Sequence, residues 1–169
     1  VRGLSNYDFS NSKVIVSIGA DFLGDWQGGG FDCSYAKGRI PDNGTMSRHI
    51  QFESNMTLSG ANADVRVPLK LNEQKLVLIE IYKSIVGNKI QLKSDISLNE
   101  KTKKIVDALI REIKSAADGS VIISGIKDED YQSLVLEINE KLNSYSFKPS
   151  NTILTRSSDD QNISRLISR

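Results

Sequence analysis

The chain has 169 residues, of which 38% are apolar and 25% are charged, so it can bury a core and does not resemble a disordered segment. Its 22 basic and 21 acidic residues give a net charge of +1, and this balance gives no electrostatic reason to expect a nucleic-acid partner. One cysteine, Cys33, and one histidine, His49, are too few for a zinc site or an iron–sulfur cluster. No apolar run is long enough for direct membrane insertion.

Three strands are predicted in the first half of the chain. Residues 13–18 are a nearly continuous β-branched run, which is typical of a buried parallel strand. A loop rich in Gly, Asp and Asn extends from there to about Met46, and residues 49–53 form the next candidate strand. Residues 65–69 alternate apolar and polar side chains, and Pro68 suggests an edge strand or a strand end.

Helices and strands alternate in the second half. Residues 73–86 are apolar on almost every side, so we expect a helix buried between layers. Ser97 and Glu100 have the spacing of a capping box for a second helix, which Asp118 and Gly119 end. The remaining predicted elements are a buried strand at 120–124, a helix capped by Asp128 and continuing to Leu142, a short strand at 152–155, and a terminal helix that begins at Asp159 and Asp160 and carries Arg165 and Arg169.

This alternation predicts one α/β domain over residues 1–169. We expect a three-layer, Rossmann-like arrangement with a mostly parallel sheet and helices on both faces. Because the chain begins at Val1 and not at methionine, we also expect it to be a fragment of a longer protein or a processed product.

Parallel sheets bind ligands at the carboxyl ends of their strands, so the loops after Ile18, Phe52 and Ser124 are the candidate site. The glycines of the first loop match neither a dinucleotide fingerprint nor a phosphate loop, and Asp21 and Asp25 lie where a pyrophosphate needs N–H donors. A surface loop is therefore the favoured interpretation. Glu53 ends the second strand and could accept ribose hydroxyls, but a solvated strand-end glutamate is the favoured interpretation.

Catalytic chemistry has little support in the residues. A serine or cysteine nucleophile needs an oriented base, and the single histidine lies on a predicted strand, so we predict no catalytic residue and no metal ligand. Trp26 lies in a polar loop, where it could anchor an interface or fold back as a lid on the loop.

Two stretches carry a family resemblance. Val14 to Leu23 resembles the first strand and loop of molybdopterin oxidoreductases, and Glu53 to Leu69 is similar to their segment with an acid, an Ala-Asp pair and a proline. Within this family, the second stretch is most similar to the molybdopterin-oxidoreductase-like part of the iron–sulfur subunit of bacterial alternative complex III. The motif that carries this similarity is Glu53-Ser54, followed by Leu58-Ser59-Gly60-Ala61 and Ala63-Asp64.

The resemblance implies a role in quinol to cytochrome c electron transfer. It implies a scaffold domain without its own active site, on the periplasmic side of the inner membrane, whose partners are other domains of the same polypeptide and membrane subunits. It implies that the molybdenum-cofactor fold persists without the cofactor in this fragment. Cofactor-binding members have Pro-Gly-Thr-Asp where this chain has Leu71 to Gln74, so the acid that helps to hold guanine is an amide here.

Two alternatives stay open. The chain could be the molybdopterin guanine dinucleotide-binding domain of an active molybdenum oxidoreductase, or a nucleotide-binding domain of unrelated lineage. The cofactor-binding positions, vestigial under the scaffold hypothesis, are Gly19, Ala20, Asp21, Glu53, Asn55 and Asp64. For Asp64 we predict a structural role, in which the carboxylate caps backbone N–H groups of the turn from Ser59 to Asp64.

Overall fold

A parallel sheet forms the centre of the computed structural model, which describes residues 4–41, 44–87, 90, 97–153 and 165–167. Its strands are β2 (Val14–Ile18), β3 (Arg48–Glu53), β4 (Val65–Pro68) and β5 (Ser120–Ser124), and their order is β4-β3-β2-β5. All three pairings are parallel, as the apolar runs of β2 and β5 predicted. Every residue of these two strands is buried.

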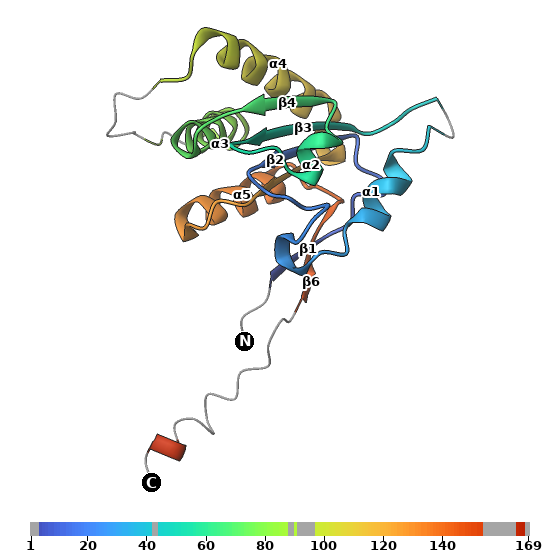
Figure 1. Ribbon diagram of the computed structural model, residues 1–169, viewed down its shortest axis with the longest axis vertical. Helices are drawn as coiled ribbons and strands as arrows, with labels where there is room; N and C mark the ends of the chain where they lie inside the picture. The colour runs from blue at the N-terminus through green and yellow to red at the C-terminus, as the bar shows by residue number, and fades with distance from the viewer. Residues whose placement is uncertain (1–3, 42–43, 88–89, 91–96, 154–164, 168–169) are drawn as a thin grey trace.

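Three long helices pack together on one face of this sheet. They are α3 (Leu71–Ile85), α4 (Glu100–Ala116) and α5 (Glu129–Lys141), and Figure 1 shows α3 between the other two. Their apolar stripes share one core with the side chains of Val16, Ile50 and Ile122. The helix α3 buries the side chains of Leu76 to Ile79, Ile81 and Tyr82, but Leu71, Asn72 and Glu80 are exposed, so the expected burial between layers is found only in part.

The other face of the sheet has a different cover. An aromatic cluster lies there, built on Ile15, Val121 and Ile123 of the sheet, and its ring-bearing members are Tyr7, Phe9, Phe22, Phe31 and Tyr35. Tyr35 comes from α1 (Asp32–Gly38), a short helix inside the segment that we predicted to be a loop. The expected helices on both faces are therefore found only in part, since the long helices share one face and a short helix with a loop covers the other.

A small antiparallel sheet lies beside the parallel one. It pairs β1 (Leu4–Tyr7) with β6 (Phe147–Ile153), so the strand predicted at 152–155 belongs to this second sheet as far as Ile153. The predicted terminal helix begins in residues outside the described part of the chain, which resumes at 165–167.

The helix caps follow the predicted chemistry with one correction. Asp128 caps α5, accepting a hydrogen bond from the N–H of Asp130. The cap of α4 is Asn99, whose side chain accepts from the N–H of Thr102 at 2.8 Å, and not Ser97. Asn99 lies one residue before the first helical residue, which is the position where a side-chain oxygen reaches the free N–H groups.

Asn139 of α5 satisfies the outer edge of β5. Its amide accepts from the N–H of Ile122 at 2.9 Å and donates to the carbonyl of the same residue at 2.7 Å. Because β5 is an edge strand, these two backbone groups face away from β2, and the side chain takes the place of another strand. Asn139 is fully buried, so water cannot replace these two bonds.

Candidate functional site

The strand order defines where a ligand site is expected. The chain passes from β2 outward through β3 to β4, and then returns to place β5 on the other side of β2. In an open parallel sheet, the crevice at such a reversal lies between the carboxyl ends of the two strands that flank it. Here these ends lead into Gly19 after β2 and Gly125 after β5.

The backbones of these two loops touch, so the crevice is closed at this point. The N–H of Gly125 donates to the carbonyl of Ile18 at 2.9 Å. A Cβ atom on Gly125 would overlap the carbonyl oxygen of Gly19. The N–H of Gly19 in turn donates to the carbonyl of Phe52 at 2.7 Å, so neither glycine offers its N–H to a phosphate.

Gln74 covers Gly19 from the side of α3. Its side chain is 3% exposed, and Nε2 donates to Ser54 Oγ at 2.9 Å and to the carbonyl of Leu69 at 3.0 Å. Its Oε1 lies 2.6 Å from the point where a Cβ of Gly19 would stand, and Gly19 has a φ of +69°. This is the position where the resemblance places a guanine-binding acid. A carboxylate could not donate to the Leu69 carbonyl, so the amide belongs to the local packing.

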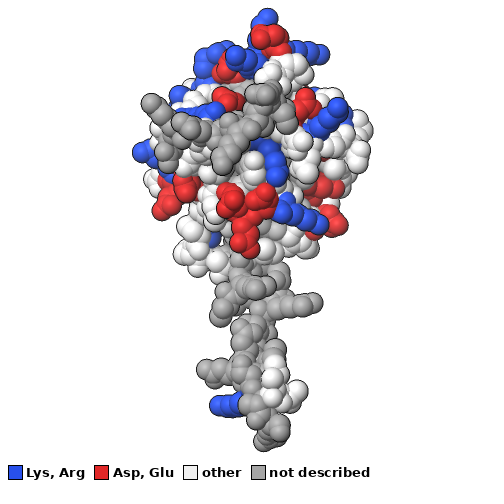
Figure 2. All heavy atoms as spheres, turned by 90° about the vertical axis from the view of Figure 1, so that its left-hand side faces the viewer, with Lys and Arg blue, Asp and Glu red and all other residues white. Residues whose placement is uncertain are grey.

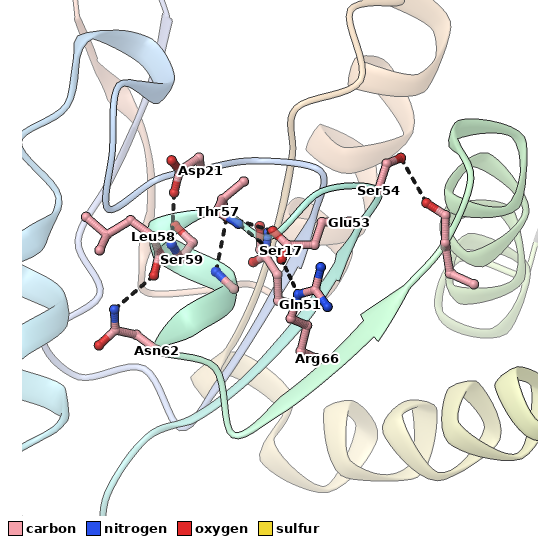
Figure 3. A network of polar contacts seen from close by, with 12 residues as sticks. Ser17, Asp21, Gln51, Glu53, Ser54, Thr57, Leu58, Ser59, Asn62 and Arg66 are labelled. Atoms are coloured by element: carbon pink, nitrogen blue, oxygen red, sulfur yellow. Dashed lines mark hydrogen bonds and ion pairs between the residues drawn. The ribbon is translucent and has the colours of Figure 1, made fainter.

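Glu53 is buried and fully bonded at the end of β3. Its carboxylate forms an ion pair with Arg66 Nε of β4 at 2.5 Å and accepts from Thr57 Oγ1 at 2.6 Å (Figure 3). It also accepts from the N–H of Thr57 and from Gln51 Nε2, each at 3.3 Å. With 2% exposure, Glu53 is not the solvated strand-end residue that we favoured from the sequence. It is equally unable to accept ribose hydroxyls without giving up a protein donor.

The turn after β3 is shaped around this carboxylate. Thr57 is the N-cap of α2 (Leu58–Ala61), and its side chain accepts from the N–H of Gly60 at 3.1 Å. A Cβ on Gly60 would overlap the Glu53 carboxylate, so only glycine fits there. The buried carboxylate of Glu53 therefore requires both the hydroxyl of Thr57 and the absence of a side chain at Gly60.

Asp21 joins the loop after β2 to the same turn. Its Oδ1 accepts from the N–H of Ser59 at 2.9 Å (Figure 3). Ser59 Oγ in turn accepts from the N–H of Leu23 at 2.9 Å. These reciprocal bonds fix the two loops against each other. Ser59 is fully buried, so the contact is part of the interior.

The other predicted site residues lie in different surroundings. Ala20 is fully buried, and its carbonyl accepts from Ser17 Oγ at 2.8 Å and from Gln51 Nε2 at 3.1 Å. Asn55 is exposed in the turn after β3. Gly19, Asp21 and Glu53 thus share the carboxyl edge of the sheet, as their positions after β2 and at the end of β3 predicted.

Asp64 lies at the opposite end of the strands. Its carboxylate forms two bonds with Arg39, at 2.7 and 2.9 Å, and accepts from the N–H of His49 at 2.7 Å. His49 precedes Glu53 by four residues on β3, so the two ends are about 13 Å apart at ~3.3 Å per residue. Gly19 and Glu53 therefore lie at one end of the strands, and Asp64 lies at the other. The bonds of Asp64 also differ from the predicted capping of the turn from Ser59, because they join β3 to Arg39, the residue after α1.

A row of buried polar side chains connects the two ends. His49, Gln51 and Glu53 alternate on β3 and point to the same face of the sheet. Tyr35 Oη lies 3.1 Å from His49 Nδ1, and His49 Nε2 lies 3.1 Å from Gln51 Oε1. Because Gln51 Nε2 donates to Ala20, its Oε1 must accept, which makes His49 the tautomer with the proton on Nε2.

Burial sets the charge of this row. Loss of hydration lowers the pKa of His49 to about 4, so the ring is neutral at pH 7. At the amino end, the hydrogen bonds from Arg39 hold the pKa of Asp64 below its usual range. We did not predict this row, although the polar residues at alternate positions of a strand were its signal in the sequence.

The remaining singled-out residues have structural surroundings. Trp26 packs against Tyr7 and Phe31, with ring centroids 5.7 and 5.4 Å apart, so it folds back on its own loop. Cys33 is exposed and unpaired. In the described part of the chain no three His, Cys, Asp or Glu residues gather as a metal site would require. No helix there is both long and apolar enough to cross a bilayer.

Acidic and basic side chains are mixed on the face of the molecule drawn in Figure 2, in keeping with the net charge of +1. Comparison with protein-family models and with curated proteins gave no match to this chain.

Proposed function

We propose that this chain is a scaffold domain of a bacterial respiratory oxidoreductase subunit of the alternative complex III type, without an active site of its own. The resemblance of Val14 to Leu23 and of Glu53 to Leu69 supports this assignment. The strand order β4-β3-β2-β5 also matches the first four strands of a Rossmann-like sheet, in which the first strand has two strands on one side and one on the other. The three-layer, Rossmann-like class is part of the proposal.

One observation carries the proposal: the polar groups at the carboxyl edge are bonded to one another. Glu53 receives four donors from the protein, and Asp21 is bonded to Ser59. A ligand could bind there only by replacing these bonds. Breaking a buried pair such as Glu53 and Arg66 typically costs about 3–5 kcal/mol, which would be subtracted from the affinity.

The residues do not fit molybdopterin guanine dinucleotide, the cofactor of the alternative hypothesis. Its guanine needs a free carboxylate acceptor, and Gln74 instead uses its amide to satisfy Ser54 and Leu69. Its pyrophosphate needs free N–H donors, whereas those of Gly19 and Gly125 bond to carbonyls. An active cofactor-binding domain is therefore the second candidate.

The exposed surface around this edge supports domain partners. Met56 is 69% exposed, Leu58 55% and Leu71 53%, and all three follow the carboxyl ends of β3 and β4. Large exposed apolar side chains on neighbouring loops are typical of a contact surface. We propose that other domains of the same polypeptide cover them, within a complex on the periplasmic side of the inner membrane.

Thermal melts test this proposal. We expect the midpoint of the full chain to stay unchanged with GDP, NAD or molybdopterin guanine dinucleotide at concentrations up to about 1 mM, because only a ligand that prefers the native state raises it. A saturable rise of several degrees would contradict the proposal. The same melts on the double variant Lys13→Met with Lys37→Met exclude a shift that is caused by anion binding at these two exposed lysines.

A further inference from the structure

A cavity of about 560 Å³ opens at the amino edge of the sheet, away from the site described above. It lies where the chain enters β2 and β3, between the segments 10–13, 37–40 and 45–47. Pockets of a few hundred cubic ångströms with a few polar groups are the usual size of small-molecule sites. Nothing in the scaffold hypothesis accounts for this cavity.

Two lysines give the cavity its charge. Lys13 and Lys37 both line it, both are exposed, and among the described residues neither ammonium group has an ion-pair partner within 4 Å. Asp8 interacts electrostatically with Lys37 without forming an ion pair. The Asp8 carboxylate accepts instead from the N–H of Ser10 at 3.0 Å and from Ser10 Oγ at 2.6 Å. The positive charge of the cavity is therefore not neutralised by a direct pair.

Besides the two lysines, the cavity is lined by hydroxyl residues and by apolar side chains. Ser47 lines the cavity and is 4% exposed, and its Oγ has no hydrogen-bond partner. A buried hydroxyl without a partner is rare in native proteins. Thr45 is a further hydroxyl residue of the lining, whereas Ile40 and Met46 are lining residues with exposed fractions of 54% and 49%.

We propose that this cavity binds a phosphate ester, with the phosphate held by Lys13 and Lys37 and the organic part lying on Ile40 and Met46. The cavity is far larger than a bare phosphate, and among the described residues its apolar members Ile40 and Met46 keep about half of their surface exposed. The ester could be a soluble metabolite or the headgroup of a phospholipid, since both present the same phosphate chemistry. The proposal is independent of the proposed function, because the two sites lie at opposite ends of the strands.

The test is a titration of the full chain with phenyl phosphate, followed by ¹H–¹⁵N NMR. We expect saturable shifts of the amides of residues 10–13, 37–40 and 45–47. Lys13→Met and Lys37→Met keep the side-chain stems and remove the charges, and each should raise the Kd by about tenfold or more, the usual effect of losing one charged hydrogen bond. Lys101→Met, an exposed lysine outside the cavity, should leave the Kd unchanged.

Two further arms define the ligand. Inorganic phosphate should bind more weakly than phenyl phosphate, and equal affinity would overturn the role of Ile40 and Met46. Sedimentation with phosphatidylglycerol vesicles that is lost in Lys13→Met identifies the lipid source, and binding of the soluble ester alone identifies a metabolite. Absence of both kinds of binding, or an equal loss in Lys101→Met, would overturn the proposal.

Discussion

Replacing Arg66 by methionine removes the cation that lies against Glu53 and keeps an unbranched side chain of similar length. The Glu53 carboxylate is 2% exposed, so water cannot take the place of the guanidinium. Leaving one member of a buried pair uncompensated typically destabilises a protein by about 3–5 kcal/mol. Because the Arg66 side chain is itself 24% exposed, we expect a loss near the lower end, about 3 kcal/mol.

The chain provides a matched control for this experiment. Arg48 and Glu112 form an ion pair of the same chemistry at 2.9 Å, but their side chains are 49% and 37% exposed. Exposed pairs contribute about 0–1 kcal/mol, so Arg48→Met should lower the free energy of unfolding by less than about 1 kcal/mol. A second control combines Glu53→Gln with Arg66→Met, which removes the buried charge and should recover a large part of the loss.

Equilibrium unfolding in urea measures the free energy of unfolding of the parent, the two single variants and the double variant. An equal slope of free energy against urea concentration shows that all four expose the same surface on unfolding. Equal losses for Arg66→Met and Arg48→Met would refute the reasoning. In that case the Glu53 carboxylate would not depend on its protein partners, and it would be free for a ligand.

Three further predictions concern the edge strand, the buried histidine and the closed crevice. Asn139→Ala should cost at least about 2 kcal/mol, because it leaves the N–H and carbonyl of Ile122 buried without partners, and an unfolding curve within about 0.5 kcal/mol of the parent would contradict this. The pKa of His49 is lowered to about 4. Below about pH 6.5 the unfolded chain therefore takes up a proton that the folded chain does not, and the free energy of unfolding decreases as the pH is lowered. Between about pH 7.5 and pH 5 the parent should lose about 2 kcal/mol more than His49→Gln, and parallel pH profiles would show that the ring titrates normally. Gly125→Ala should cost about 1–3 kcal/mol, because the new methyl overlaps the Gly19 carbonyl, and an unchanged melting midpoint would mean that the crevice can open.

The parts of the fold that depend on local pattern could be predicted from the sequence. The β-branched runs of β2 and β5 and the capping aspartate of α5 are local signals, and the structure has these elements where they were expected. The position of Gly19 and Glu53 at one sheet edge follows from parallel strands alone.

The parts that depend on long-range packing could not be predicted. Whether helices cover one face or both is decided by which apolar surfaces meet, and a short segment such as α1 becomes helical only as Tyr35 packs on the sheet. The burial of Glu53 depends on Arg66, a residue of the neighbouring strand, and no local pattern reveals this pairing. Asp64 was predicted to cap its own turn, but its carboxylate bonds to Arg39 and to the N–H of His49, which are distant in the sequence.

The central claim is that the carboxyl edge of the sheet is closed to anionic dinucleotides by its own side chains. The most direct measurement is a ¹H–¹⁵N NMR titration of the chain with GDP, using the amides of Gly19, Gly60 and Gly125 as reporters. We predict that these three resonances do not shift, whether or not the amides of residues 10–13 and 45–47 at the amino edge shift. Saturable shifts of Gly19 and Gly125 that persist in Lys13→Met with Lys37→Met would contradict the claim.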